Sequence, residues 1–128
     1  MKKLFSIAFA AILLSSCSNA QSGQNNLSPT AFAAKIKATP NAVILDVRRP
    51  DEYAGGHVAN ALNYDWNGSQ FAKQIASLDK SKPVFVYCLS GRRSASAARK
   101  LRADGFKMVY EMDGGMSGWS ASHLPETK

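Results

Sequence analysis

The chain lacks the features on which several protein classes depend. With two cysteines in 128 residues it can form one disulfide bond at most, which excludes a disulfide-stapled framework. Its apolar runs are far shorter than the roughly 20 residues of a spanning helix, which excludes a multi-span membrane protein. Cys88 and two separated histidines are fewer ligands than a zinc site needs. It has no internal repeat, no RNA-binding signature and no basic helix with interleaved aromatic residues. We therefore expect no metal, no other cofactor and no nucleic-acid partner.

What is present is an ordinary globular composition with a basic balance. Hydrophobic residues make up 45% and charged residues 20% of the chain, whose length allows one domain. Lys and Arg number 16 against 9 Asp and Glu, a formal net charge of +7. A surplus of this kind favours anionic substrates or anionic lipid headgroups.

Residues 1–16 have the pattern of a secretory signal peptide, in which two lysines precede an apolar run from Leu4 to Leu14. The tetrapeptide Leu-Ser-Ser-Cys that ends at Cys17 resembles a bacterial lipobox. We therefore predict cleavage before Cys17 and lipidation of that cysteine. Ordinary signal-peptidase cleavage near Ala20 is the alternative.

The residues after Cys17 are polar and predict a flexible tether over 17–27, followed by a folded domain over 28–126. A protein lipidated in this way would be anchored to a bacterial membrane and would face the periplasm. Ser18 is not an acidic retention signal, which favours the outer membrane over the inner membrane. Under the alternative cleavage the protein would be soluble in the periplasm.

Strand and helix signals alternate through the rest of the chain. Apolar runs predict strands over 42–45, 61–64, 84–87 and 108–112. Helical spacing and start signals predict helices over 28–38, 51–54, 71–78 and 94–104, with a short last helix around Trp119. This alternation predicts an α/β fold with a central parallel sheet flanked by helices on both faces.

The chemistry is concentrated directly after the second strong strand, where Cys88 stands. Ligands bind outside the carboxyl ends of the strands in open α/β sheets. Gly91 permits a tight bend, and Arg92 and Arg93 add two positive charges. Ser94 is predicted as the N-cap of the next helix. Because cations and free helix amides stabilise a thiolate, we expect Cys88 to be a partly exposed, reactive nucleophile rather than an inert core residue.

The spacing between the cysteine and the arginines of this loop limits which reactions it could catalyse. Phosphatases with a cysteine nucleophile use a Cys-x5-Arg loop, but here that position is Ser94, and Arg93 makes the spacing Cys-x4-Arg. The smaller ring of backbone amides suits a persulfide sulfur better than a phosphate or arsenate tetrahedron. An internal dithiol mechanism is excluded if Cys17 is lipidated, because Cys88 is then the only thiol left.

Three segments together resemble the rhodanese-like domain family, and the resemblance extends over residues 28–125. They are the segment 45–53 (Leu-Asp-Val-Arg-Arg-Pro-Asp-Glu-Tyr) with Gly-Gly-His-Val at 55–58, the loop 88–94, and Gly114-Gly115 with Trp119. The resemblance implies a single-domain sulfurtransferase with a central parallel sheet. It also implies that a cysteine takes a sulfane sulfur from a donor such as thiosulfate, holds it as a persulfide and passes it to cyanide or another thiophilic acceptor.

On this resemblance, Cys88 would be the catalytic sulfur carrier. The substrate-binding loop would consist of Leu89, Ser90, Gly91, Arg92, Arg93 and Ser94. Arg92 and Arg93 would attract the anionic donor. Thiosulfate enzymes of the family often carry cations early in this loop, where the present chain has Leu89 and Ser90. The sequence therefore does not identify the sulfur donor and acceptor of this chain.

Asp46 and Arg48 belong to the segment 45–53, here called the early motif. They would support the site through charged hydrogen bonds that hold the end of their strand near the loop 88–94. A solvated ion pair is the alternative reading of these two residues. His57 is expected to be a structural polar residue rather than a base. Neither His57 nor His123 can be placed beside the catalytic cysteine from the sequence.

Two classes of function lead after these arguments, and a phosphatase or arsenate reductase is a third option that the loop length disfavours. The first is an exported sulfurtransferase, acting as a monomer on a small sulfur donor and on a thiophilic acceptor that is a small molecule or a protein thiol. The second is a rhodanese-like protein-binding or redox-sensing module without turnover. Formation of a persulfide on Cys88 separates the two.

Overall fold

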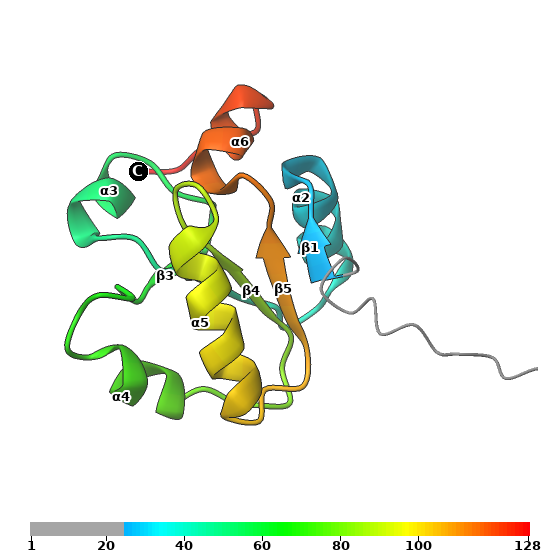
Figure 1. The fold of residues 1–128 in the computed structure, drawn as a ribbon. Coiled ribbons are helices and arrows are strands. Elements are labelled where there is room, and N and C mark those ends of the chain that lie inside the picture. The colour runs from blue at the N-terminus through cyan, green and yellow to red at the C-terminus, as the bar shows by residue number, and fades with distance from the viewer. Residues whose placement is uncertain (1–24) are drawn as a thin grey trace, which may run out of the picture.

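A five-stranded parallel sheet organises residues 25–128, the part of the chain that the computed structural model describes (Figure 1). The strands are β1 (Asn26–Leu27), β2 (Val43–Asp46), β3 (Leu62–Asn63), β4 (Val84–Tyr87) and β5 (Val109–Met112). They lie in the order β1-β5-β4-β2-β3, and each neighbouring pair is parallel. The predicted signal peptide and the lipidation site at Cys17 lie outside the described residues.

Helices cover both faces of the sheet, which confirms the predicted fold class (Figure 1). They are α2 (Pro29–Ala38), α3 (Pro50–Ala54), α4 (Phe71–Ala76), α5 (Arg92–Ala103) and α6 (Gly115–Ala121). The Ser28 side chain accepts a hydrogen bond from the Ala31 amide at 3.2 Å and so caps the start of α2. No helix within residues 25–128 is long and apolar enough to cross a membrane.

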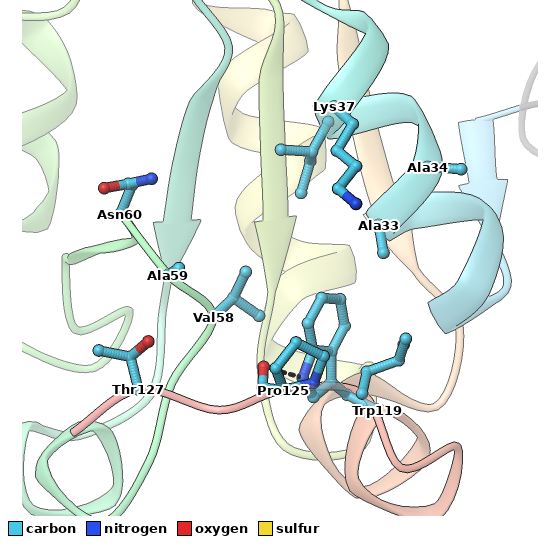
Figure 2. A pocket seen from close by; sticks show the side chains of 11 residues that line it. Ala33, Ala34, Lys37, Val58, Ala59, Asn60, Trp119, Pro125 and Thr127 are labelled. Atoms are coloured by element: carbon cyan, nitrogen blue, oxygen red, sulfur yellow. Dashed lines mark hydrogen bonds between the residues drawn. The ribbon is translucent and has the colours of Figure 1, made fainter.

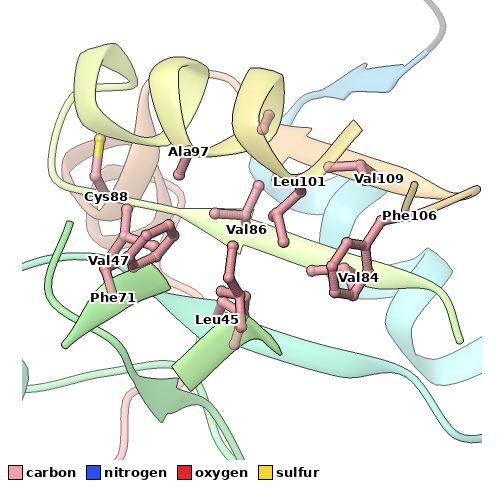
Figure 3. Packing of buried hydrophobic residues seen from close by; sticks show 12 residues of the cluster. Leu45, Val47, Phe71, Val84, Val86, Cys88, Ala97, Leu101, Phe106 and Val109 are labelled. Atoms are coloured by element: carbon pink, nitrogen blue, oxygen red, sulfur yellow. The ribbon is translucent and has the colours of Figure 1, made fainter. Parts of the chain in front are cut away.

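Two apolar clusters hold the helices against the sheet. Alternate strand residues such as Leu45 and Val86 pack with α4 and α5 on one face (Figure 3). Their neighbours Ile44 and Phe85 pack with α2 and α6 on the other face. All four residues of β4 are buried, which explains why this strand reads as a continuous apolar run rather than as an alternating pattern.

The ordered domain is longer at both ends than the sequence predicted. Asn26 and Leu27, which the sequence placed in the tether, pair with β5, and the Leu27 carbonyl accepts from the Asp113 amide at 2.7 Å. At the other end, the backbones of His57 and Thr127 exchange two hydrogen bonds of 2.8 Å. Both additions are long-range backbone pairings, which side-chain patterns do not reveal.

Candidate active site

Cys88 lies at the carboxyl end of β4, and the loop that follows it leads directly into α5. The prediction that its side chain is partly exposed is wrong, because the residue is only 1% exposed. The side chain belongs to the apolar cluster beneath α5, which also contains Val47 and Phe71 (Figure 3). The sulfur is therefore held among side chains of β2, α4 and α5 rather than at the surface.

The loop supplies hydrogen bonds to the sulfur. The Gly91 amide donates to Cys88 Sγ at 3.1 Å, and the Ser94 hydroxyl oxygen lies 3.4 Å from it. Burial raises the pKa of the Cys88 thiol, but hydrogen bonds with the Ser94 hydroxyl and with the amides of Ser94, Gly91 and Ser90 outweigh that effect. The net pKa therefore lies below the ordinary value of a thiol, which favours the nucleophilic thiolate.

The start of α5 differs from the prediction in a way that matters for this loop. The helix begins at Arg92, and its N-cap is Gly91, whose φ of 112° lies in the left-handed region. Ser94, predicted as the N-cap, is instead buried inside the first turn. Its hydroxyl donates to the Gly91 carbonyl at 3.2 Å, so it braces the bend and faces the sulfur at the same time.

Helix α6 holds the other side of the loop. The Met116 amide donates to the Cys88 carbonyl at 2.8 Å, and the Ser117 amide donates to the Leu89 carbonyl at 3.0 Å. In a trans peptide the carbonyl and the following amide point in opposite directions. Binding both carbonyls to α6 therefore turns the amides of Leu89 and Ser90 away from α6. The Gly-Gly motif before this helix is visible in the sequence, but its contact with the loop is not.

Gly115 makes this contact possible. Its φ is +55°, and a Cβ atom there would lie 2.5 Å from the Cys88 carbonyl oxygen and 2.6 Å from that of Leu89. No side chain larger than hydrogen fits between α6 and the loop. This close approach explains why the chain has glycine at position 115.

The two arginines of the loop differ in their surroundings. Arg93 donates to both carboxylate oxygens of Glu52, at 2.8 and 3.0 Å. That hydrogen bonding lowers the pKa of Glu52 to about 2. Arg92 is exposed and belongs to none of the ion pairs formed within residues 25–128. Of the two predicted anion-attracting cations, Arg92 is therefore the one whose charge is available to an incoming donor.

Glu52 is a site residue that the sequence did not predict. It stands in the Asp-Glu-Tyr of the early motif, 41 residues before the arginine that it binds. Its acidic side chain was the only available signal, and an acid in a polar segment is most often a solvated surface residue.

Asp46 and Arg48 form a buried pair rather than a solvated one. They are 0% and 4% exposed, and the Arg48 guanidinium donates to both Asp46 oxygens, with a shortest distance of 2.7 Å. Arg48 Nη2 also donates to the Gly56 carbonyl at 2.7 Å. The Asn63 side-chain amide donates to the backbone carbonyls of both residues. These bonds tie the end of β2 to β3 and to the segment that follows α3.

The histidines do not hydrogen-bond to Cys88. His57 stacks on the Tyr53 ring with centroids 3.7 Å apart, and its Nδ1 lies 3.0 Å from the Tyr53 carbonyl. His123 stands in the exposed segment after α6. Within residues 25–128, no three His, Cys, Asp or Glu side chains come together as a metal-binding group.

The surface of the described domain has several hollows, of which two are compared with the position of the loop. One, of about 570 Å³, borders the loop at Leu89 and is lined mainly by α3 and α6. It presents the half-exposed Leu89 beside Met116 and the acidic side chains of Glu52 and Glu126. The other, of about 520 Å³, is an apolar groove between α2 and the C-terminal segment (Figure 2). No residue of the loop 88–94 lines this second groove, so the first hollow is the one adjacent to the sulfur site.

Comparison with known proteins agrees with this geometry. The family model described as rhodanese-like domain matches residues 28–122, and the chain therefore belongs to the rhodanese-like domain family, as its motifs indicated. Thiosulfate sulfurtransferase GlpE of Pseudomonas putida is 35% identical over 99 residues, covering 77% of this chain and 88% of that protein. The GlpE protein of Coxiella burnetii is 46% identical over 81 residues, covering 63% of this chain and 74% of that protein.

Solved structures give the same result. A rhodanese-related protein from Thermoplasma volcanium superposes with a TM-score of 0.71 at 27% identity, covering 80% of this chain and 97% of that one. The rhodanese-like domain of an Anabaena protein also gives a TM-score of 0.71 at 27% identity, covering 80% of this chain and 78% of that one. Together with the family match, these relatives support rhodanese-type sulfurtransferase activity.

Proposed function

We propose that this protein is an exported sulfurtransferase that moves a sulfane sulfur from a donor such as thiosulfate to a thiophilic acceptor through a persulfide on Cys88. The observation that carries the proposal is the setting of Cys88 Sγ at the carboxyl end of β4. There the Gly91 amide donates to it at 3.1 Å and the Ser94 hydroxyl lies 3.4 Å away. Relatives named thiosulfate sulfurtransferase support the same reaction.

The reaction consists of two displacements at sulfur. The Cys88 thiolate attacks the outer sulfur of thiosulfate, a new S–S bond forms, and the old S–S bond breaks to release sulfite with its electron pair. The outer sulfur then carries the negative charge as a persulfide. In the second step a nucleophile such as cyanide takes that sulfur, which yields thiocyanate and returns the thiolate. No oxidant or reductant is consumed.

The residues around the sulfur serve both steps. The Gly91 amide donates to the sulfur and stabilises negative charge on the attacking thiolate and on the persulfide. The Ser94 hydroxyl adds to this effect when it turns from the Gly91 carbonyl to donate to the thiolate. The exposed Arg92 at the start of α5 attracts the anionic donor. Because Arg93 is bound to Glu52, the loop presents less positive charge than its sequence suggests. That balance favours donors and acceptors of low negative charge alongside thiosulfate.

Intact mass spectrometry tests the sulfur-transfer step. The chain from residue 17 with Cys17→Ser, in which Cys88 is the one remaining thiol, is measured before and after incubation with thiosulfate. We expect a gain of one sulfur atom that cyanide removes and that Cys88→Ala abolishes. If thiosulfate, polysulfide and mercaptopyruvate all leave the mass unchanged, the sulfurtransferase proposal fails and a binding or redox-sensing module takes its place.

We also propose that Cys17 is lipidated and anchors the domain to the periplasmic face of a bacterial membrane. The support is the signal-peptide pattern and the Leu-Ser-Ser-Cys tetrapeptide. Metabolic labelling of the full chain with an alkyne fatty acid in a bacterial host tests it. We expect label on the wild type and none on Cys17→Ser. An unlabelled wild-type protein that ends at a site near Ala20 would establish the soluble periplasmic form instead.

A further inference from the structure

The charges of the domain are distributed unevenly between the two edges of the sheet. The segments that precede β4 and β5, residues 79–83 and 99–108, carry six cations and two acids. The segments that follow strands at the opposite edge, residues 47–60, 64–70, 88–93 and 113–128, carry five cations and five acids. The basic surplus of the domain therefore lies at the edge where β4 and β5 begin, opposite the Cys88 loop (Figure 1).

Three lysines dominate this basic edge. Val84 pairs with Val109, so Lys82 and Lys107 belong to the neighbouring segments that lead into β4 and β5. Lys80 joins them, because its carbonyl accepts from the Lys107 amide at 3.4 Å. All three lysines are exposed, and none of the ion pairs formed within residues 25–128 includes them.

An exposed apolar side chain lies among these lysines. Met108 is 39% exposed, and its carbonyl accepts from the amide that opens β4 at 2.8 Å. Basic side chains around an exposed apolar one match the headgroup boundary of an anionic bilayer. They match single-stranded nucleic acid less well, since such sites stack bases on aromatic rings. The large exposed hydrophobic residues within 25–128 are Leu62, Leu89 and Met108, with no aromatic residue among them.

The course of the chain points to the same partner. β1 runs parallel to β5 and begins at Asn26, so the chain enters the sheet from the side where the strands begin. The segment between Cys17 and Asn25 spans roughly 30 Å at full extension. An anchor at Cys17 would thus keep the domain within reach of the membrane, where a weak attraction is enough to orient it.

We propose that the basic edge formed by Lys80, Lys82, Lys107 and Met108 binds the anionic headgroups of the membrane that carries the anchor. In this orientation the Cys88 loop, at the opposite edge, faces away from the bilayer and is open to donors and acceptors. The inference rests on the proposed membrane location. It assigns the basic edge a function separate from sulfur transfer.

Vesicle sedimentation tests the surface itself. The chain from residue 17 with Cys17→Ser has no acyl group, so its binding reports the protein surface alone. We expect it to bind vesicles of phosphatidylcholine that contain phosphatidylglycerol and to dissociate from them as the salt concentration is raised. We expect no binding to vesicles of pure phosphatidylcholine. The double variant Lys82→Gln/Lys107→Gln should lower the partition coefficient about tenfold or more.

The matched control removes two cations from the opposite edge, as Arg49→Gln/Lys128→Gln. Its partition coefficient should stay within about twofold of the parent. Equal losses in both double variants would show that net charge alone matters and would overturn the proposal. So would no binding to anionic vesicles, or tighter binding to a single-stranded oligonucleotide than to vesicles.

Labelling of the anchored protein tests the orientation. In vesicles carrying the lipidated chain, a membrane-impermeant amine reagent should modify Lys82 and Lys107 more slowly when phosphatidylglycerol is present, and Lys128 at an unchanged rate. Equal rates at all three lysines would overturn the orientation. The persulfide assay on the same samples reports sulfur transfer separately, and the unacylated chain tests lipid binding even if Cys17 is not lipidated. Failure of one proposal is therefore distinguishable from failure of the other.

Discussion

Replacing Gly115 with alanine tests whether α6 holds the active-site loop. The added Cβ would lie 2.5 Å from the Cys88 carbonyl oxygen, whereas ordinary contact begins at 3.4 Å. The helix and the loop must therefore separate by about 0.9 Å at this point. Such a shift stretches the two hydrogen bonds of 2.8 and 3.0 Å that join Met116 and Ser117 to the loop beyond bonding distance.

The expected loss in the free energy of unfolding is the sum of three costs. Alanine in the left-handed conformation costs about 1–2 kcal/mol. Loss of the two backbone hydrogen bonds costs about 1 kcal/mol each. Overpacking against the loop backbone adds about 1–3 kcal/mol. We expect Gly115→Ala to lower the free energy of unfolding by about 4–7 kcal/mol. We also expect the pKa of Cys88 to rise toward the ordinary thiol value as the loop amides lose their alignment.

Gly114 supplies a matched control. Its φ of +71° is also left-handed, but a Cβ there would meet nothing closer than Gly118 Cα at 3.7 Å. Gly114→Ala therefore carries the backbone strain without the clash and should cost about 1–2 kcal/mol. Urea unfolding gives both stabilities, and the rate of persulfide formation on Cys88 gives the effect on the site. If Gly115→Ala matches Gly114→Ala in stability and rate, the contact between α6 and the loop does not hold the site.

Three further predictions concern the charged and polar groups of the site. Ser94→Ala should raise the pKa of Cys88, seen as a shift to higher pH in the rate of alkylation, and an unshifted profile would mean that the hydroxyl does not stabilise the thiolate. Asp46→Asn leaves the buried Arg48 guanidinium without its charge partner and should lower the free energy of unfolding in urea by about 3 kcal/mol. A loss below about 1 kcal/mol would contradict this prediction, because only a solvated pair contributes so little. The folded-state pKa of Glu52 is about 2 against an ordinary 4.5, so its ion pair stabilises the fold fully above pH 4.5 and loses that contribution as the pH falls through 2. Glu52→Gln should be less stable at neutral pH and should lack this part of the acid dependence, and parallel stability profiles for variant and wild type would contradict the assignment.

Local pattern was enough for the architecture and for the position of the nucleophile. The continuous apolar run of β4 predicts a strand covered on both faces. Because Cys88 directly follows this run, it must lie at the carboxyl end of the strand. The Gly-Arg-Arg that follows the cysteine predicts a bend into a helix, although the helix begins two residues before the expected Ser94. These features depend on neighbours in the sequence, so the sequence alone determined them.

The tertiary structure determined which groups surround the sulfur and which charges are neutralised. Glu52 binds Arg93 across 41 residues, so one of two adjacent arginines that look equivalent in the sequence is paired and the other is exposed. The course of the loop after Cys88 depends on α6, whose amides bind the Cys88 and Leu89 carbonyls beside a glycine that admits no side chain. The separation of the basic edge from the Cys88 loop likewise arises from the parallel pairing of the strands, which places all their beginnings on one side and their ends on the other. Each of these depends on contacts between distant segments, whose energies come from packing geometry and not from any local pattern.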